Sequence, residues 1–175
     1  MMFMEIEIPA QVQIEVKGDE ITTKGALGSN SRRFNDALLK VAKSGSRLTV
    51  TPITEKKLAK KAMMAERSLA KEITNDMNGV SKHFEIQMQV VFAHFPITIE
   101  VKGDTINIKN IIGERAPRTS KIVGSTKVEV KGQTMRLYGT RLDDVSQTAA
   151  NLRKACKIVK KDSRIFQDGV YYAIE

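Results

Sequence analysis

The chain has 175 residues, of which 29 are Lys or Arg and 20 are Asp or Glu, giving a formal charge of +9; hydrophobic residues make up 41% and Trp is absent. This composition excludes disordered and fibrous proteins and provides apolar material for one ordinary domain or two small ones. The longest strictly apolar run, residues 90–93, is far shorter than the roughly 20 residues of a membrane-spanning helix. Glu5 and Glu7 stand where a targeting segment would be basic, so we expect a soluble, cytoplasmic protein with no membrane partner.

The charge favours a polyanionic partner and is unevenly distributed. The pI is near 9.7. Residues 1–87 contain 14 basic and 11 acidic residues, whereas residues 88–175 contain 15 and 9, so the second half is the expected anion-binding half. The alternative is that the excess of lysine only keeps the protein soluble. The single cysteine, Cys156, cannot form an internal disulfide, which fits a reducing compartment.

The first predicted element is a hairpin that occurs twice in the chain. Residues 14–28 read IEVKGDEITTKGALG and residues 99–113 read IEVKGDTINIKNIIG, with nine of fifteen positions identical. Apolar and polar residues alternate up to the shared Lys-Gly-Asp, which is typical of a strand with one buried face before a tight turn. The separation of 85 residues favours two copies of a small domain. The residues expected to face a core are Val12, Ile14, Val16, Ile99 and Val101.

The rest of the first half predicts a short helix, a strand and a long helix. The short helix covers residues 35–43 and ends at Gly45, and the strand RLTVTPI covers residues 47–53. The long helix covers residues 55–77, with Thr54 as N-cap and Asn78-Gly79 as its stop. Its apolar stripe recurs at spacings of three and four residues: Leu58, Ala62, Ala65, Leu69 and Ile73.

The second half predicts strands followed by one long helix in the same way. A strand covers residues 85–93, a further hairpin reads VEVKGQTMRLYG over residues 128–139, and a last strand covers residues 170–174. The helix covers residues 145–159, with Asp144 as N-cap and Gln147 in the capping-box position. Its predicted stripe is Val145, Ala149, Leu152, Cys156 and Val159. We therefore predict an α+β protein of two tandem duplicated domains, residues 1–79 and 80–175, each an antiparallel sheet packed against one long helix.

Catalytic residues form no recognisable pattern. His83 and His94 lack the spacing of a zinc pair, and Cys156 lies on an apolar helix face where a buried, inert thiol is expected. Asp143 and Asp144 are interpreted as residues of a helix start. The sequence has no Walker-type, GxGxxG or GxSxG motif. We expect a protein that is not an enzyme and uses no metal, cofactor or small-molecule substrate.

Three basic segments of the second half could reach phosphate groups. The first is GERAPRTSK at residues 113–121, where Pro117 stiffens a loop carrying arginines, whose planar fork matches phosphate oxygens. The second is the polar face of the last helix, for which a solvated lysine-rich surface is the alternative. The third is the tail, residues 161–164 leading into FQDGVYY at 166–172, where Tyr171 or Tyr172 stacks on a base or packs. If about six of these groups neutralise phosphates, the log-log slope of affinity against salt should be about four to five.

Several long motifs in order resemble the universal large-subunit ribosomal protein L-six family, in its archaeal-type branch related to the eukaryotic L-nine protein. They are the duplicated hairpins, HFPI at residues 94–97, GERAPRTSKIVGSTKVEVKG at 113–132, DDVSQTAANLRKACKI at 143–158 and DSRIFQDGVYY at 162–172; the run RSLAKEITNDMNGVSKHFE at 67–85 is a looser match. The resemblance implies two α+β copies without a catalytic role. It also implies that residues 80–175 are the main domain for binding large-subunit ribosomal RNA, near the sarcin/ricin loop and the factor-binding region, beside neighbouring ribosomal proteins.

The RNA contacts that the resemblance and the basic helix face imply come from the loop, the last helix and the tail: Arg115, Arg118, Lys121, Gln147, Asn151, Arg153, Lys154, Lys157, Lys160, Lys161, Arg164 and Tyr171. Bacterial relatives commonly carry Gly-Lys-Gly where this chain has Gln167-Asp168-Gly169, and Asp168 would repel a phosphate there. We expect replacement of Arg115 and Arg118 by Ala to weaken RNA association without lowering the melting temperature.

A protein-interaction scaffold is the rival hypothesis. In that case exposed edge strands, residues 85–93 or 170–174, would recruit a partner by strand addition.

Overall fold

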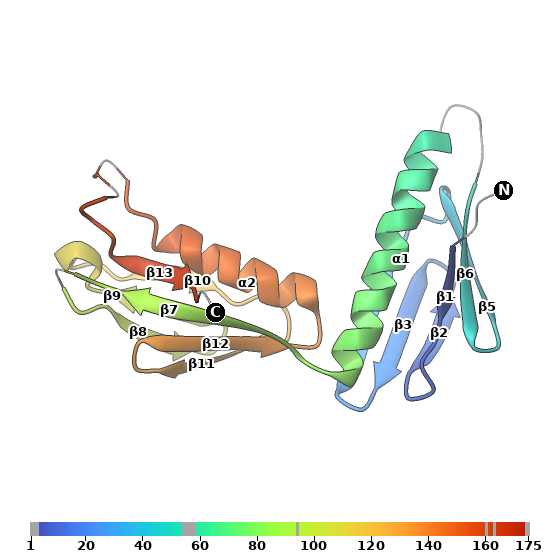
Figure 1. Ribbon diagram of the computed structural model, residues 1–175, viewed down its shortest axis with the longest axis horizontal. Helices are drawn as coiled ribbons and strands as arrows, with labels where there is room; N and C mark the ends of the chain where they lie inside the picture. The colour runs from blue at the N-terminus through green and yellow to red at the C-terminus, as the bar shows by residue number, and fades with distance from the viewer. Residues whose placement is uncertain (1–3, 54–58, 94, 160, 163, 174–175) are drawn as a thin grey trace. The chain divides into compact units, whose positions relative to one another are not determined.

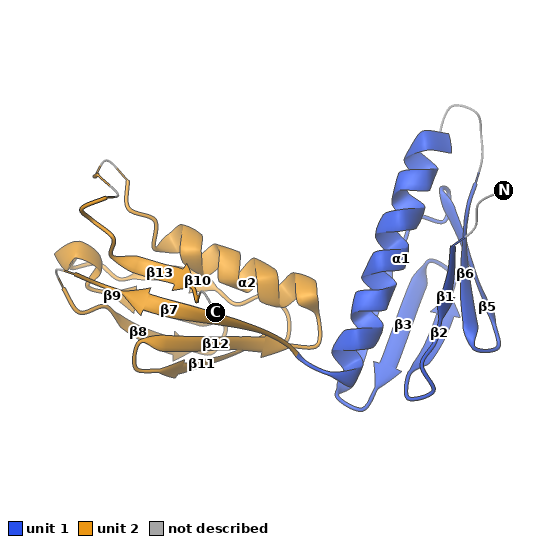
Figure 2. Ribbon diagram, in the orientation of Figure 1, with its two compact units in different colours: residues 1–83 blue, residues 84–175 orange. Residues whose placement is uncertain are grey.

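The computed structural model describes residues 4–53, 59–93, 95–159, 161–162 and 164–173. The chain forms two compact units, Met1–His83 and Phe84–Glu175, which are blue and orange in Figure 2. Each unit combines antiparallel strands with one long helix, which confirms the predicted α+β class, and the strands of each unit divide into two sheets. Among the described residues, neither helix combines the length and apolar character needed to cross a membrane.

Unit 1 contains two three-stranded sheets and helix α1 (Ala59–Ser81), which packs on β3 and β6 (Figure 1). The strand orders are β1-β6-β5 and β2-β3-β4. The strands are β1 (Met4–Glu7), β2 (Gln13–Lys17), β3 (Glu20–Gly25), β4 (Gly28–Arg33), β5 (Leu39–Ser44) and β6 (Arg47–Pro52).

Unit 2 contains a three-stranded sheet, a four-stranded sheet and helix α2 (Leu142–Ala155). The strand orders are β10-β9-β8 and β11-β12-β7-β13. The elements before and after α2 are β7 (Phe84–Val91), β8 (Thr98–Lys102), β9 (Thr105–Lys109), η1 (Ile111–Gly113), β10 (Arg118–Lys121), β11 (Lys127–Lys131), β12 (Thr134–Gly139) and β13 (Gly169–Tyr172). Because β7 lies between β12 and β13, the prediction of an exposed edge at residues 85–93 is wrong; the edge strands of this sheet are β11 and β13.

The repeated Lys-Gly-Asp forms a two-residue hairpin turn in both units. Lys17 pairs with Glu20 and Lys102 with Thr105, and the glycine between them has φ of 59° in unit 1 and 56° in unit 2. A positive φ at the first turn position suits a hairpin and costs glycine nothing, since it has no Cβ. Both hairpins were predicted from this pattern.

The predicted core faces are confirmed with one exception. Val12 and Ile14 are buried and Val16 packs against the core of unit 1, while Ile99 packs against the core of unit 2. Val101 is instead 39% exposed. Val101 lies one residue before the exposed turn of residues 102–104, where less of the unit covers a side chain than at Ile99, which is two residues further from the turn.

The predicted helix over residues 35–43 is wrong. This segment is a turn followed by strand β5, in which the Asn35 carboxamide oxygen accepts the N–H of Ala37 at 3.0 Å. Along β5, Leu39 is buried and Val41 pairs with Val50 of β6, so pairing with a partner strand prevailed over local helix preference. Gly45 forms the hairpin turn between β5 and β6 and does not end a helix.

Helix α1 continues beyond its predicted stop. The residues of its predicted stripe that can be placed lie in or against the core: Ala62, Ala65, Leu69 and Ile73. Asn78 and Gly79 are helical, and the helix ends at Ser81, because the β3–β4 turn covers its last residues. The Leu27 N–H donates to the Val80 carbonyl at 3.1 Å. The compact units therefore divide after His83 rather than after Gly79, while the predicted N-cap Thr54 and the stripe residue Leu58 lie outside the described residues.

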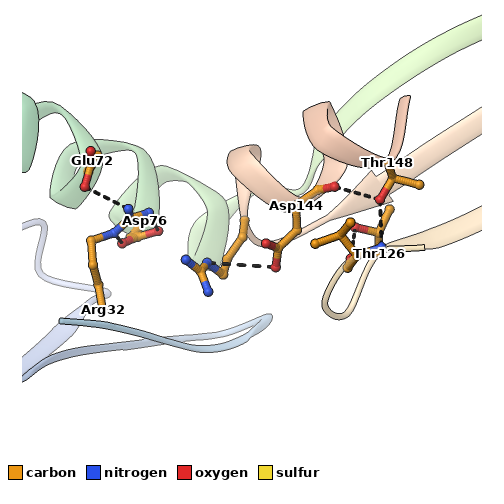
Figure 3. Close-up of polar contacts among 8 residues, drawn as sticks. Arg32, Glu72, Asp76, Thr126, Asp144 and Thr148 are labelled. Atoms are coloured by element: carbon orange, nitrogen blue, oxygen red, sulfur yellow. Dashed lines mark hydrogen bonds and ion pairs between the residues drawn. The ribbon is translucent and has the colours of Figure 1, made fainter. Parts of the chain in front are cut away.

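Helix α2 differs from its prediction at both ends. It begins at Leu142, with Arg141 as an N-cap that makes no side-chain cap bond, so the predicted capping box is wrong. Thr148 ties the helix to the loop after β10, because its hydroxyl donates to the Asp144 carbonyl at 2.7 Å and accepts the Val123 N–H at 3.0 Å (Figure 3). The predicted stripe is buried from Val145 to Cys156, but the helix ends at Ala155 and Val159 is 69% exposed.

Candidate nucleic-acid interface

The three basic segments predicted from the sequence meet at one end of unit 2. Arg118 donates hydrogen bonds to the carbonyls of Ala155 and Lys157, so the loop before β10 lies against the C-terminal end of α2. The tail then returns to the sheet as β13, next to the same helix. Figure 1 shows η1, the end of α2 and the tail at this end of the unit.

A cavity of about 560 Å³ opens between the end of α2, the tail and β13, and we call it the basic hollow. The small and apolar residues that line it include Ala150, Cys156, Gly169 and Val170. All charged residues that line it within the described chain are basic: Arg153, Lys154, Lys157 and Lys161. Each of these charged residues therefore attracts an anion that enters the hollow.

Aromatic rings line the rest of the basic hollow. The Arg153 guanidinium lies 5.6 Å from the centre of the Tyr172 ring, and the Lys161 ammonium lies 5.2 Å from the centre of the Phe166 ring. Such cation–π contacts fix the position of both the cation and the ring. The third ring, Tyr171, lies over Gly169, where an added Cβ would come within 3.4 Å of its Cε2.

Sequence reasoning omitted Phe166 from the site and left Tyr172 as an alternative to Tyr171. Tyr172 meets a helix residue 19 positions earlier in the chain, and no local pattern indicates that contact. The available signal was composition: Phe166, Tyr171 and Tyr172 follow closely after a lysine-rich helix end. Aromatic residues interleaved with cations are typical of surfaces that bind single-stranded nucleic acid.

Arg118 has a structural role that the sequence did not indicate. Its Nε and Nη2 donate to the Glu114 carboxylate at 2.8 and 2.6 Å, and its Nη1 donates to the carbonyls of Ala155 and Lys157 at 3.0 and 2.9 Å. The guanidinium thus caps the C-terminal end of α2, where unpaired carbonyls carry partial negative charge. The Glu114 hydrogen bond raises the pKa of Arg118, and Arg118 in turn lowers the pKa of Glu114. Four of its five donors are already used.

The other residues of that loop are available at the surface. Arg115 is exposed at the tip, and Lys121 is exposed at the end of β10, where it pairs with Thr105 of β9. Arg115 is therefore placed to meet a ligand at this end of the unit, whereas Lys121 lies at the far end of β10, next to the β8–β9 turn.

The remaining predicted contacts are placed in three different ways. Gln147 and Asn151 lie on α2 outside the hollow, and the Gln147 amide donates to the Asn151 carbonyl oxygen at 2.8 Å. Arg164 is exposed but forms an ion pair with Asp162 at 2.8 Å, which lowers the pKa of Asp162 and raises that of Arg164. Lys160 lies outside the described residues.

Two residues that the sequence analysis considered are buried in unit 2. Asp168 was expected to repel a phosphate at this point of the tail, but it is 1% exposed and its Oδ1 accepts the Ala93 N–H at 2.6 Å, which fastens the tail to the end of β7. Cys156 is 3% exposed, and burial raises its pKa to about 11. Its thiol is therefore protonated at neutral pH, as expected of an inert, buried cysteine.

The fold and the site define a protein of two α+β units in which the second unit gathers cations and aromatic rings around an open hollow. A family model described as Ribosomal protein L6 matches residues 95–169. The large ribosomal subunit protein uL6 of Methanocella arvoryzae is 43% identical over 168 residues, which are 95% of this chain and 93% of that protein. The protein of the same name from Methanobrevibacter smithii is 42% identical over 95% of this chain and 92% of its own length. The one from Ignicoccus hospitalis is 35% identical over 97% of this chain and 93% of its own length.

The chain belongs to the ribosomal protein L6 family. The resemblance found in the sequence is thereby confirmed. Members of this family are structural proteins of the ribosome, so the expectation that the chain is not an enzyme is also confirmed.

Proposed function

We propose that this chain is a structural component of the large ribosomal subunit and that unit 2 anchors it by binding large-subunit ribosomal RNA near the sarcin/ricin loop and the factor-binding region. The observation that carries the proposal is the basic hollow, where Arg153, Lys154, Lys157 and Lys161 surround an open cavity. The names of the uL6 relatives support the assignment to the large subunit.

Binding would use phosphate contacts more than base-specific ones. Six cations of unit 2 would make such contacts: Arg115, Lys121, Arg153, Lys154, Lys157 and Lys161. Arg118 and Arg164 are already paired with carboxylates, so they contribute less to an approaching RNA. Phosphate and shape recognition is the usual mode for folded RNA, whose deep groove does not admit side chains.

The proposal assigns RNA binding mainly to the second half of the chain. Residues 80–175 would form the main RNA-binding domain, and neighbouring ribosomal proteins would be further partners of the chain.

The test is binding to a transcript of large-subunit ribosomal RNA, measured by filter retention at fixed salt. Replacing Lys154 and Lys157 with Ala should weaken binding by roughly 10- to 100-fold, since each removes a phosphate contact. The control replaces Lys127 and Lys131, which are exposed on β11 of the same unit, with the same loss of charge. Equal weakening by both pairs would mean that net charge matters and the hollow does not.

Footprinting of the same complex tests the location. Hydroxyl radicals should cleave the RNA less around the sarcin/ricin loop when the protein is bound. Protection elsewhere, with that region unchanged, would contradict the proposed position.

A further inference from the structure

The basic hollow has features that phosphate binding alone does not require. Besides its cations it is lined by apolar residues and three aromatic rings, and its volume of about 560 Å³ is within the range of roughly 300–1,000 Å³ typical of small-ligand sites. Tyr171 and Tyr172 both line it, and each is 40% exposed. A phosphate group binds to exposed cations without an apolar wall, so the wall indicates an apolar part of the ligand.

The three rings differ in what covers them. Tyr172 and Phe166 each have a cation over one face, at 5.6 and 5.2 Å. Among the described residues Tyr171 has no such cation, and its ring lies over Gly169, where the missing side chain leaves room for it. Tyr171 is therefore a flat surface supported from below by the backbone of β13.

We propose that the basic hollow receives one unstacked nucleobase of the bound RNA, which stacks on Tyr171 while its flanking phosphates contact Lys154 and Lys157. The inference rests on the proposed function and specifies what the hollow takes: a nucleotide splayed out of the helical stack. Every base has an aromatic face that can stack on tyrosine. An acidic peptide would satisfy the lysines but would leave the ring without a flat partner.

The chain offers a direct optical test because it contains no Trp. The variant Tyr171→Trp places one indole at the proposed stacking position, where a stacked base should quench its fluorescence when large-subunit ribosomal RNA binds. The control variant is Tyr138→Trp on β12, away from the hollow, where the tyrosine hydroxyl bonds to Glu129 at 2.8 Å. Its fluorescence should not change on binding.

Affinity gives a second, independent measurement. Tyr171→Ala should lower the affinity for the same RNA by about 5- to 150-fold, the usual effect of removing one base–aromatic stack, and leave the salt slope unchanged. Lys154→Ala should instead reduce that slope by about 0.7 to 0.9. Tyr171→Phe keeps the ring and should bind within about twofold of the parent protein.

The outcomes separate this inference from the proposed function. If RNA binds with full affinity to Tyr171→Ala and the indole at 171 is not quenched, the base-binding inference is wrong and the proposed function stands. If no form of the protein binds the RNA at low salt, both fail. Quenching by ribosomal proteins in the absence of RNA would mark the hollow as a protein-binding site and overturn the inference.

Discussion

Replacing Arg118 with Ala should destabilise unit 2, although the residue lies in a basic loop that looks like an RNA contact. The side chain makes four hydrogen bonds, two to the Glu114 carboxylate and two to carbonyls at the end of α2. Solvent weakens the carboxylate pair, since the side chains of Arg118 and Glu114 are 27% and 44% exposed, so we assign about 1 kcal/mol to that pair. The two carbonyl bonds at the helix end add about 1–2 kcal/mol.

The free energy of unfolding should therefore fall by about 2–3 kcal/mol, which lowers the Tm of a domain of about 100 residues by roughly 8–20 °C. Thermal unfolding followed by circular dichroism measures this change. Arg118→Lys should recover little of the loss, because a single ammonium cannot reproduce the planar fork that bonds Glu114 and the helix end together.

Arg115→Ala is the matched control, since it removes the same residue type three positions earlier from an exposed site. Its Tm should change by no more than about 2 °C, while its RNA affinity should decrease. The reasoning is refuted if Arg118→Ala melts at the same temperature as Arg115→Ala. The earlier expectation for the Arg115 and Arg118 pair, weaker binding at an unchanged Tm, should hold for Arg115 only.

Three further changes test other contacts. Arg32→Ala leaves the 4% exposed Asp76 without its 2.8 Å partner (Figure 3), so urea denaturation should show unit 1 destabilised by about 3 kcal/mol; an unchanged midpoint would contradict the buried pair. Gly25→Ala would bring a Cβ within 2.6 Å of the Val80 side chain and 2.8 Å of its carbonyl, and should cost about 1–3 kcal/mol; a midpoint unchanged from that of the parent would mean that α1 moves aside freely. Glu114→Gln should reduce stability at pH 7, where the carboxylate with its lowered pKa stabilises the fold. The difference in stability from the parent should disappear as the pH falls below 4.5, the usual pKa of glutamate, and through the lowered pKa of Glu114. A difference that persists in acid would mean that the Glu114 carboxylate does not cause it.

Local patterns in the sequence predicted those elements whose stabilising contacts are close in the chain or periodic. The Lys-Gly-Asp turns need only a glycine at the first turn position, and the stripe from Ala62 to Ile73 needs only helical spacing. Residues 35–43 failed because their structure depends on pairing with β6, which local preference does not include. The stop at Asn78-Gly79 failed because the β3–β4 turn supports α1 beyond it.

The candidate site was predicted as a region better than as a set of contacts. Charge and loop position were enough to locate the cations that line the hollow. They could not distinguish the structural role of Arg118 from the exposed position of Arg115, because some hydrogen-bond partners of Arg118 lie at the end of a helix nearly 40 residues later. The same limit applies to Asp168, whose partner Ala93 is 75 residues away and whose burial no local pattern indicates.

The dependence of RNA affinity on salt tests the central claim most directly, because each neutralised phosphate adds a fixed amount to the slope. For the full chain and a large-subunit ribosomal RNA transcript, the log of the affinity should fall with the log of the salt concentration with a slope of about four to five, as expected for six phosphate contacts. The Lys154 and Lys157 double variant should reduce that slope by about 1.4 to 1.8. A slope below about one for the parent protein would contradict an electrostatic anchor at the end of unit 2.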